Sequence, residues 1–164
     1  MGESVRRVDA LRQRYPEPNK NGKQRYLTLL RIETASGAVG WGEAISGTEE
    51  ASLAIKTVVD RGVADLVVGR DPLDVQTIWD DLRQQTYWTG TDGIVTFGLS
   101  AIDMALWDVA GHVAGLPAHR LMGGLRRERI RAASSVIFDT EAIDGIGRQC
   151  ADLHAAGYNT SRLW

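Results

Sequence analysis

The stretch that decides the fold is Gly98–Gly124, which reads GLSAIDMALWDVAGHVAGLPAHRLMGG. Its apolar residues recur at steps of three and four, at Leu99, Ile102, Ala105, Leu106, Val109, Ala110 and Val113. At about 100° per residue these positions form one stripe, which predicts a helix buried on that side. Gly115 suits the left-handed residue that ends a helix, and Pro117 suits the first turn of a second helix. Gly123 and Gly124 end that short helix, so the stretch predicts a buried helix, a sharp corner and a short helix beside it.

Short motifs follow one another in this stretch at fixed spacing. They are Ala105-Leu106-Trp107-Asp108, Gly111-His112, Leu116-Pro117 and Leu121-Met122-Gly123-Gly124. In this order they resemble the helical signature of the mandelate racemase / muconate-lactonizing branch of the enolase superfamily. His112 departs from that pattern, because the family usually has Lys, Arg or Gln at this position. This part of the family's fold is mainly scaffold, so the resemblance indicates a fold more than a chemistry.

Composition sets outer bounds on the class of protein. The chain has 164 residues and a formal net charge of −2, which suggests roughly one domain and indicates no nucleic-acid partner. The single cysteine, Cys150, forms no internal disulfide, which fits a reducing compartment. We find no apolar run long enough to span a bilayer and no signal peptide at the start of the chain. These features predict a cytoplasmic protein without a membrane partner.

The first third of the chain predicts antiparallel strands. Residues 25–34 alternate with Tyr26, Thr28, Leu30 and Ile32 on one face, which is typical of a strand. A turn at 35–38 leads into a second strand over 39–44, whose alternate glycines suggest a close approach of backbone. The pattern of 5–11 fits neither strand nor helix well and favours a first strand only weakly. Residues 15–23 are rich in turn formers and predict a loop.

Helices are expected next. Thr48 suits a helix N-cap followed by acidic residues, and this helix should stop near Gly62. Asp71-Pro72 predicts the start of another helix, with an N-cap followed by proline in the first turn.

After Gly124 the pattern changes. Residues 130–138 predict a strand, 140–156 a helix and 158–164 another strand, an order that suggests a parallel strand–helix–strand unit. The sequence stops at Trp164 inside the last strand, so we expect a truncated or partial protein. The alternative is a short domain whose last strand pairs with a partner.

The resemblance implies an α+β fold in two parts. Residues 1–125 correspond to the family's capping domain, a three-stranded antiparallel meander with a helical bundle. Residues 126–164 correspond to the first βαβ portion of a truncated (β/α) barrel. Complete members of the family abstract the proton α to a carboxylate and stabilise the enediolate on Mg²⁺. The family's metal ligands lie on later barrel strands, so the resemblance places no metal ligand in this chain.

The resemblance also implies site residues. Aligning Gly157-Tyr158 with the family's second barrel strand places Arg162 and Trp164 at the Lys-x-Lys positions of many members. Arginine stays protonated at neutral pH and holds a carboxylate by two hydrogen bonds, whereas tryptophan transfers no proton. A lysine base is therefore absent from this strand. The alternative is that both are ordinary strand residues.

Two loops correspond to the lid that closes over the barrel mouth in the family, at 15–23 and 44–49. The lid residues suited to an anionic or hydroxylated substrate are Asn19, Lys20, Lys23 and Ser46. The alternative for each of them is a solvated polar loop. Asp108 and His112, four residues apart on the predicted helix, suit a surface or interface ion pair.

Three functions remain open. The first is the N-terminal part of a Mg²⁺-dependent dehydratase or racemase acting on a carboxylate-bearing small molecule, inactive as this chain alone. The second is a capping domain that persists by itself as an interaction module. It would pair through its apolar barrel-side surface, which a homo-oligomer would protect. The third is a degenerate pseudoenzyme, which would have a full barrel with substituted ligands.

Overall fold

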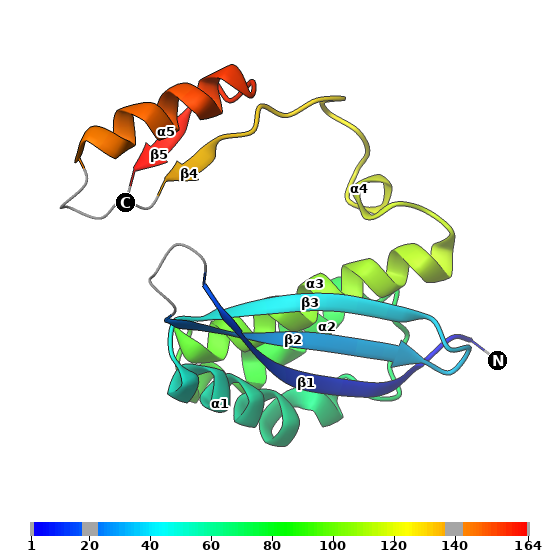
Figure 1. Cartoon of the computed structure of the whole chain (residues 1–164). Coiled ribbons are helices and arrows are strands. Elements are labelled where there is room, and N and C mark those ends of the chain that lie inside the picture. The colour runs from blue at the N-terminus through cyan, green and yellow to red at the C-terminus, as the bar shows by residue number, and fades with distance from the viewer. Residues whose placement is uncertain (1, 18–22, 137–142, 164) are drawn as a thin grey trace. The chain divides into compact units, whose positions relative to one another are not determined.

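The structure is a computed structural model that describes residues 2–17, 23–136 and 143–163 (Figure 1). Its contacts divide the chain into two compact units, Met1–Gly124 and Leu125–Trp164.

The first unit contains the expected three-stranded antiparallel sheet. Its strands are β1 (Val5–Pro16), β2 (Gln24–Thr34) and β3 (Val39–Ser46), in the spatial order β1-β2-β3. The weak pattern of the first strand has a physical cause, because the register with β2 shifts between Val5 and Arg7. This irregularity interrupts the alternation of faces, and the strand then continues five residues beyond Leu11, to Pro16.

Helical segments follow the sheet. They are α1 (Glu49–Thr57), the π-helical η1 (Val58–Val63), the 3₁₀ turn η2 (Ala64–Leu66), α2 (Val75–Gln85), the 3₁₀ turn η3 (Tyr87–Thr89), α3 (Ile94–Ala114) and α4 (Ala118–Leu121). Thr48 caps α1 as predicted, because its Oγ1 accepts a hydrogen bond from the Ala51 N–H at 3.3 Å. Gly115 adopts the predicted left-handed conformation at the end of α3, with φ 65°.

The predicted start of a helix at Asp71-Pro72 is wrong. The Asp71 carboxylate accepts from the backbone N–H of Leu73 at 2.9 Å, and the Asp74 N–H donates to the Asp71 carbonyl at 3.1 Å. Both bonds form a turn, and α2 begins only at Val75. A short aspartate side chain serves a turn as readily as a helix cap, so the local pattern was ambiguous.

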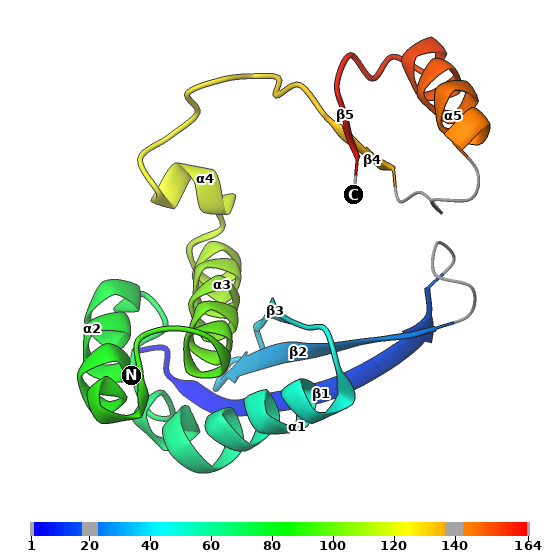
Figure 2. The ribbon, with the colours of Figure 1, turned by 90° about the vertical axis from the view of Figure 1, so that its left-hand side faces the viewer.

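The helices pack on one face of the sheet (Figure 1). Figure 2 shows α2 and α3 on this side, with α1 running along the β1 edge. The backbones of β3 and α3 approach closely at Gly40 and Gly42, where an added Cβ would overlap the carbonyl oxygens of Ala105 and Ala101. Glycine at these two alternate positions therefore allows α3 to lie directly on β3.

The helix α3 corrects one expectation. By length and composition it is apolar enough to cross a membrane, whereas the sequence was expected to contain no such run. Its apolar stripe is instead part of the core, since Leu99, Ile102 and Leu106 are each no more than 1% exposed.

The second unit contains β4 (Ser134–Val136), α5 (Ile143–Ala155) and β5 (Ser161–Leu163). β4 and β5 pair in parallel, with Ser135 opposite Arg162. The expected strand–helix–strand unit is thereby confirmed, and among the described residues its strands begin later than predicted, at Ser134 and Ser161.

Candidate functional site

The helix-facing side of the sheet changes from apolar to polar toward the β1–β2 hairpin. The register places residues of β1, β2 and β3 side by side in rows. The first row is Ala10, Leu30 and Gly42, and the next row toward the hairpin is Arg12, Thr28 and Ala44. The last row is Arg14, Tyr26 and Ser46. Side chains two residues apart on a strand point to the same face, so all three rows face the helices. The first row is buried, and the next two carry hydroxyl and guanidinium groups.

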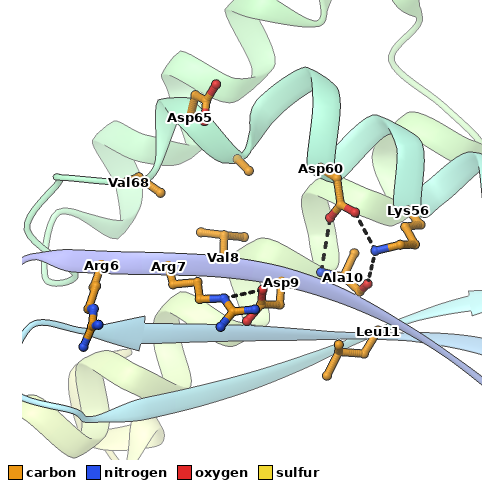
Figure 3. Close-up of a pocket in the computed structure, with 11 residues that line it drawn as sticks. Arg6, Arg7, Val8, Asp9, Ala10, Leu11, Lys56, Asp60, Asp65 and Val68 are labelled. Atoms are coloured by element: carbon orange, nitrogen blue, oxygen red, sulfur yellow. Dashed lines mark hydrogen bonds and ion pairs between the residues drawn. The ribbon is translucent and has the colours of Figure 1, made fainter.

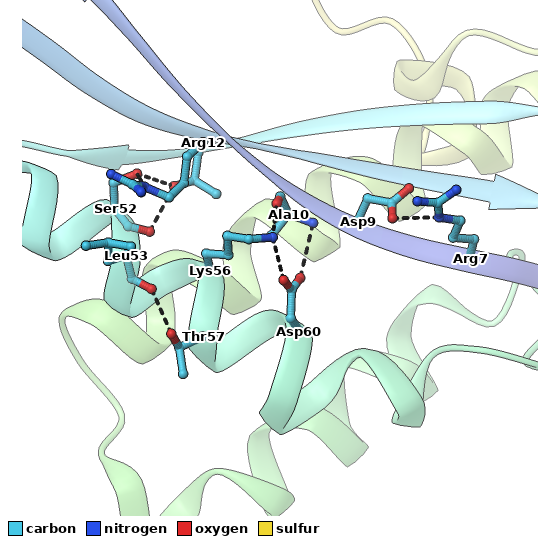
Figure 4. Close-up of polar contacts among 10 residues, drawn as sticks. Arg7, Asp9, Ala10, Arg12, Ser52, Leu53, Lys56, Thr57 and Asp60 are labelled. Carbon is cyan, nitrogen blue, oxygen red and sulfur yellow. Dashed lines mark hydrogen bonds and ion pairs between the residues drawn. The ribbon is translucent and has the colours of Figure 1, made fainter.

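The middle row is bound to α1. The Thr28 Oγ1 lies 3.0 Å from the Ser52 Oγ, and the Arg12 Nε donates to that same Oγ at 3.3 Å. The Arg12 Nη2 also donates to the Glu49 carboxylate at 3.0 Å. Figure 4 shows Arg12 reaching from β1 to Ser52 on the helix. These bonds satisfy the middle row and fasten β1 and β2 to α1.

The last row has no such partners. Ser46 is 2% exposed, and its Oγ is the buried side-chain oxygen that lacks a hydrogen bond among the described residues. The side chains of Arg14 and Tyr26 likewise make no hydrogen bond or ion pair within the described part of the chain. A pocket of about 240 Å³ opens beside them, lined by Arg12, Gln13, Arg14, Tyr26 and Glu49. Unpartnered polar groups beside a pocket are able to bind a polar ligand.

The base of the hairpin is held by residues on either side of its tip. The Glu17 N–H donates to the Lys23 carbonyl at 3.0 Å, which joins the two strands. The Arg25 Nη1 donates to the Glu17 carboxylate at 2.6 Å, and Glu17 is 7% exposed. These contacts join the end of β1 to the start of β2.

A larger pocket of about 440 Å³ lies between β1 and the α1–η2 segment (Figure 3). Its charges are largely used within the protein. The Lys56 Nζ donates to the Ala10 carbonyl at 2.7 Å and to the Asp60 carboxylate at 2.5 Å, and Asp60 accepts from the Ala10 N–H at 3.3 Å. Arg7 and Asp9 pair at 2.6 Å. This pocket therefore presents paired charges and is the weaker candidate.

Some of the predicted site residues lie in the described part of the chain, and the others do not. Ser46 ends β3 in the unpartnered row, and the exposed Lys23 precedes β2 at the same end of the sheet. Arg162 pairs with Ser135 through the β5 backbone, and its side chain lies outside the description. Asn19, Lys20 and Trp164 lie outside the described residues.

No metal centre is formed within the described part of the chain. There, no three side chains of His, Cys, Asp or Glu come together in a way that holds a cation. The described residues thus do not fit a Mg²⁺ site.

Sequence reasoning missed Arg14 and Tyr26. The alternation of β2 had placed Tyr26 on the same face as Leu30, an apolar residue four positions further along the strand. A polar end on an otherwise apolar face was the available signal. Arg14 gave none, because the irregular pattern of β1 hid which face it occupies.

Comparisons with known proteins identify relatives for most of the chain. The family description "Mandelate racemase / muconate lactonizing enzyme, N-terminal domain" matches residues 10–123. A D-galactonate dehydratase of Pectobacterium atrosepticum is 35% identical over 137 residues, which cover 82% of this chain and 34% of that protein. A D-galactonate dehydratase family member of Pseudarthrobacter chlorophenolicus is 39% identical over 109 residues, covering 66% of this chain and 26% of that protein.

A solved structure supports the same relationship. The mandelate racemase/muconate lactonizing protein of Paracoccus denitrificans PD1222, complexed with magnesium, matches with a TM-score of 0.80 at 28% identity. The match covers 99% of this chain and 42% of that one. This chain therefore spans less than half the length of the relatives that it matches.

Proposed function

This chain belongs to the mandelate racemase / muconate lactonizing enzyme family of the enolase superfamily, as its N-terminal domain, and on that premise we propose that it caps an acid-sugar dehydratase. The complete protein would remove the proton α to the substrate carboxylate, with Mg²⁺ stabilising the enediolate. The single observation that carries the proposal is the 35% identity to a D-galactonate dehydratase over 82% of this chain.

Residues 126–164 contribute the beginning of the barrel in this proposal. A pair of parallel strands buries too little to stand alone, and a parallel strand pair followed by further strand–helix units is how such barrels are built. Arg162 would then lie on a barrel strand, where a guanidinium holds a substrate carboxylate through two hydrogen bonds. Trp164 would be its neighbour on that strand and transfer no proton.

The first unit contributes the lid in this proposal. Support comes from the described ends of the two segments, since β1 ends at Pro16 and β3 ends at Ser46, and Ser46 shares a row of the sheet with Arg14 and Tyr26. A lid of this kind binds the substrate and excludes water when it closes. Asn19, Lys20 and Lys23 would serve it from the hairpin.

Mg²⁺ would lower the energy of the enediolate by neutralising its developing charge. The described residues do not fit a site for it, so we assign no residue of this chain to the metal and no step to the chain through it. Isolated, the 164-residue chain is then expected to be inactive. A cytoplasmic location and a homo-oligomeric assembly complete the proposal.

The test begins with the coding DNA beyond Trp164. We expect the reading frame to continue and to supply acidic residues at the ends of later strands. The longer protein should convert D-galactonate or a related sugar acid to its 2-keto-3-deoxy product, and chelation of Mg²⁺ should abolish this activity. A longer protein that binds Mg²⁺ and dehydrates no sugar acid would overturn the assignment.

The alternative, a capping domain that acts as an interaction module, makes a different prediction. In that case the 164-residue chain alone should sediment as one discrete, folded oligomer. Aggregation or a poorly folded second unit would favour the enzyme.

A further inference from the structure

We propose that the pocket between β1 and the α1–η2 segment binds a small neutral carboxamide, held by the backbone N–H and carbonyl of Val8. The pocket lies at the β1 edge of the capping unit, and none of Arg14, Tyr26 and Ser46 lines it. This site takes part in no step of the proposed function and stands independently of it.

The first argument is the direction of the backbone groups along β1. The register advances two residues on β1, from Val5 to Arg7, against one residue on β2. Such a bulge changes which residues point their backbone groups away from β2. Before the bulge Val5 points outward, where it bonds to residues 69–70, and after it Ala10 points outward, toward side chains of α1 and η1. Every second residue of an antiparallel strand points the same way, so Val8 points outward as well.

The second argument is what lies on either side of Val8. Residues 69–70 close the edge on one side, and the side chains of Lys56 and Asp60 close it on the other (Figure 3). The outward groups of Val8 make no hydrogen bond within the described part of the chain. The open part of the edge is thus one residue long. A foreign strand would have to displace both neighbours to pair there, whereas a single group with one donor and one acceptor would not.

The third argument is the chemistry of that single group. Asp60 and Lys56 bind the neighbouring edge position, Ala10, with one acceptor and one donor. A primary carboxamide carries a donor N–H and an acceptor oxygen on one planar group, so it is able to make the same two bonds to Val8. A carboxylate has no donor at neutral pH, and an ammonium group has no acceptor.

The fourth argument is the size and charge of the pocket. Its volume of about 440 Å³ lies in the range of small-molecule sites. Its formal charges cancel, and one opposite pair on β1 and another between α1 and η1 are already formed. Charge therefore favours neither an anion nor a cation, and the apolar walls of Val8, Ala64 and Val68 suit an apolar body. The charged lining residues are Arg6, Arg7, Lys56, Asp9, Asp60 and Asp65.

The test measures binding to the 164-residue chain by ¹H–¹⁵N NMR titration. The probe is benzamide, a primary carboxamide on an apolar ring. Acetophenone has the same size and keeps only the acceptor, and benzoate replaces the donor by a negative charge. We expect benzamide to shift the amide signals of residues 8–10 and 64–68. The other two compounds should bind about fivefold to tenfold more weakly, the worth of one hydrogen bond.

Variants locate the site. Val8→Pro removes the backbone donor, and an edge strand tolerates proline where the N–H points outward, so benzamide should bind about fivefold to tenfold more weakly. Its control is Val8→Thr, which keeps both backbone groups and the branched shape and should bind as the wild type does. Val68→Trp fills the pocket from an exposed wall and should abolish binding. Its control is Leu73→Trp, at an exposed position outside the lining.

Each contrary result overturns a stated part. No shift with benzamide, or unchanged binding in Val68→Trp, would refute the site. Unchanged binding in Val8→Pro would refute the backbone pair. Circular dichroism checks each fold, and if Val8→Pro does not fold, acetophenone and Val68→Trp decide instead. Equal affinity for acetophenone would refute the carboxamide, and equal affinity for benzoate would refute the neutral class. None of these results depends on catalysis, so an inactive longer protein would refute the proposed function without touching this site.

Discussion

The Asp108 carboxylate accepts a hydrogen bond from the backbone N–H of Trp41 at 2.8 Å, joining α3 to β3 across 67 residues of sequence. One turn further along α3, the His112 Nδ1 lies 2.6 Å from the Val39 carbonyl oxygen, to which it donates as the N–H tautomer. β3 is an edge strand, so these backbone groups would otherwise face solvent or a foreign strand. The ion pair expected between Asp108 and His112 is replaced by two contacts with the strand.

The opposite edge is closed in the same manner. Lys56 and Asp60, also four residues apart, bind the carbonyl and the N–H of Ala10 on β1 (Figure 4). A helical pair with this spacing places two side chains on one face, within reach of both backbone groups of one edge position. The capping unit thus protects both edges of its sheet with side chains from its own helices.

Removing the acceptor at the β3 edge should destabilise the capping unit. We expect Asp108→Ala to lower the free energy of unfolding by about 1.5–3 kcal/mol, the value typical of a hydrogen bond to a charged group. Asp108→Asn keeps an acceptor oxygen and should cost less. Urea denaturation followed by circular dichroism measures both. Equal losses for the two variants would contradict the role of the hydrogen bond.

The β1 edge makes a parallel prediction. Lys56→Met keeps the aliphatic stem and removes the donor shared by the Ala10 carbonyl and Asp60. We expect a loss of about 1–2 kcal/mol in unfolding free energy. Lys23→Met, at an exposed position, is the control and should change stability little. A loss as large in the control would show that the effect is one of general charge.

The close approach of β3 and α3 should tolerate no side chain. At Gly42 an added methyl group would overlap the Ala101 carbonyl, which is backbone and unable to move alone. We expect Gly42→Ala to cost about 3 kcal/mol or more, at the upper end of overpacking effects. Gly47→Ala is the control, because no atom lies within 4 Å of its added Cβ. Similar midpoints of thermal unfolding for the two variants would refute the packing argument.

The stability of the protein should depend on pH through the carboxyl group of Asp103. Burial raises the pKa of this carboxyl on α3 above its ordinary value. The folded state therefore binds the proton more tightly than the unfolded state, and the stability of the protein falls as pH rises from the unfolded pKa through the folded one. Asp103→Asn lacks this titration. We expect it to unfold at a higher temperature than the wild type at about pH 7, and the gain to shrink toward about pH 3.

Differential scanning calorimetry across that pH range checks this expectation. Asp92→Asn, on the exposed loop before α3, is the matched control. A stabilisation by Asp103→Asn that does not change with pH would contradict a titrating cause.

Local spacing determined much of the fold in advance. The apolar residues of α3 recur every three to four positions, and those of β2 alternate, so both elements can be predicted from local sequence. The left-handed Gly115 could be predicted from a glycine at the end of the helical pattern. The same spacing misled at Asp71-Pro72, since an aspartate followed by proline suits a turn as well as a helix start. Ser46 and Lys23 were predicted as site residues from a family resemblance. Such a resemblance indicates which positions matter but not which side chains they contact.

Only the tertiary structure brought together Arg14, Tyr26 and Ser46, because they come from three strands and their register decides which residues meet. It also decided that Asp108 and His112 serve the edge of β3. Neither fact can be read from local sequence. The partner of a side chain depends on which strand or helix packs beside it, and that neighbour is decided by the packing of the whole unit.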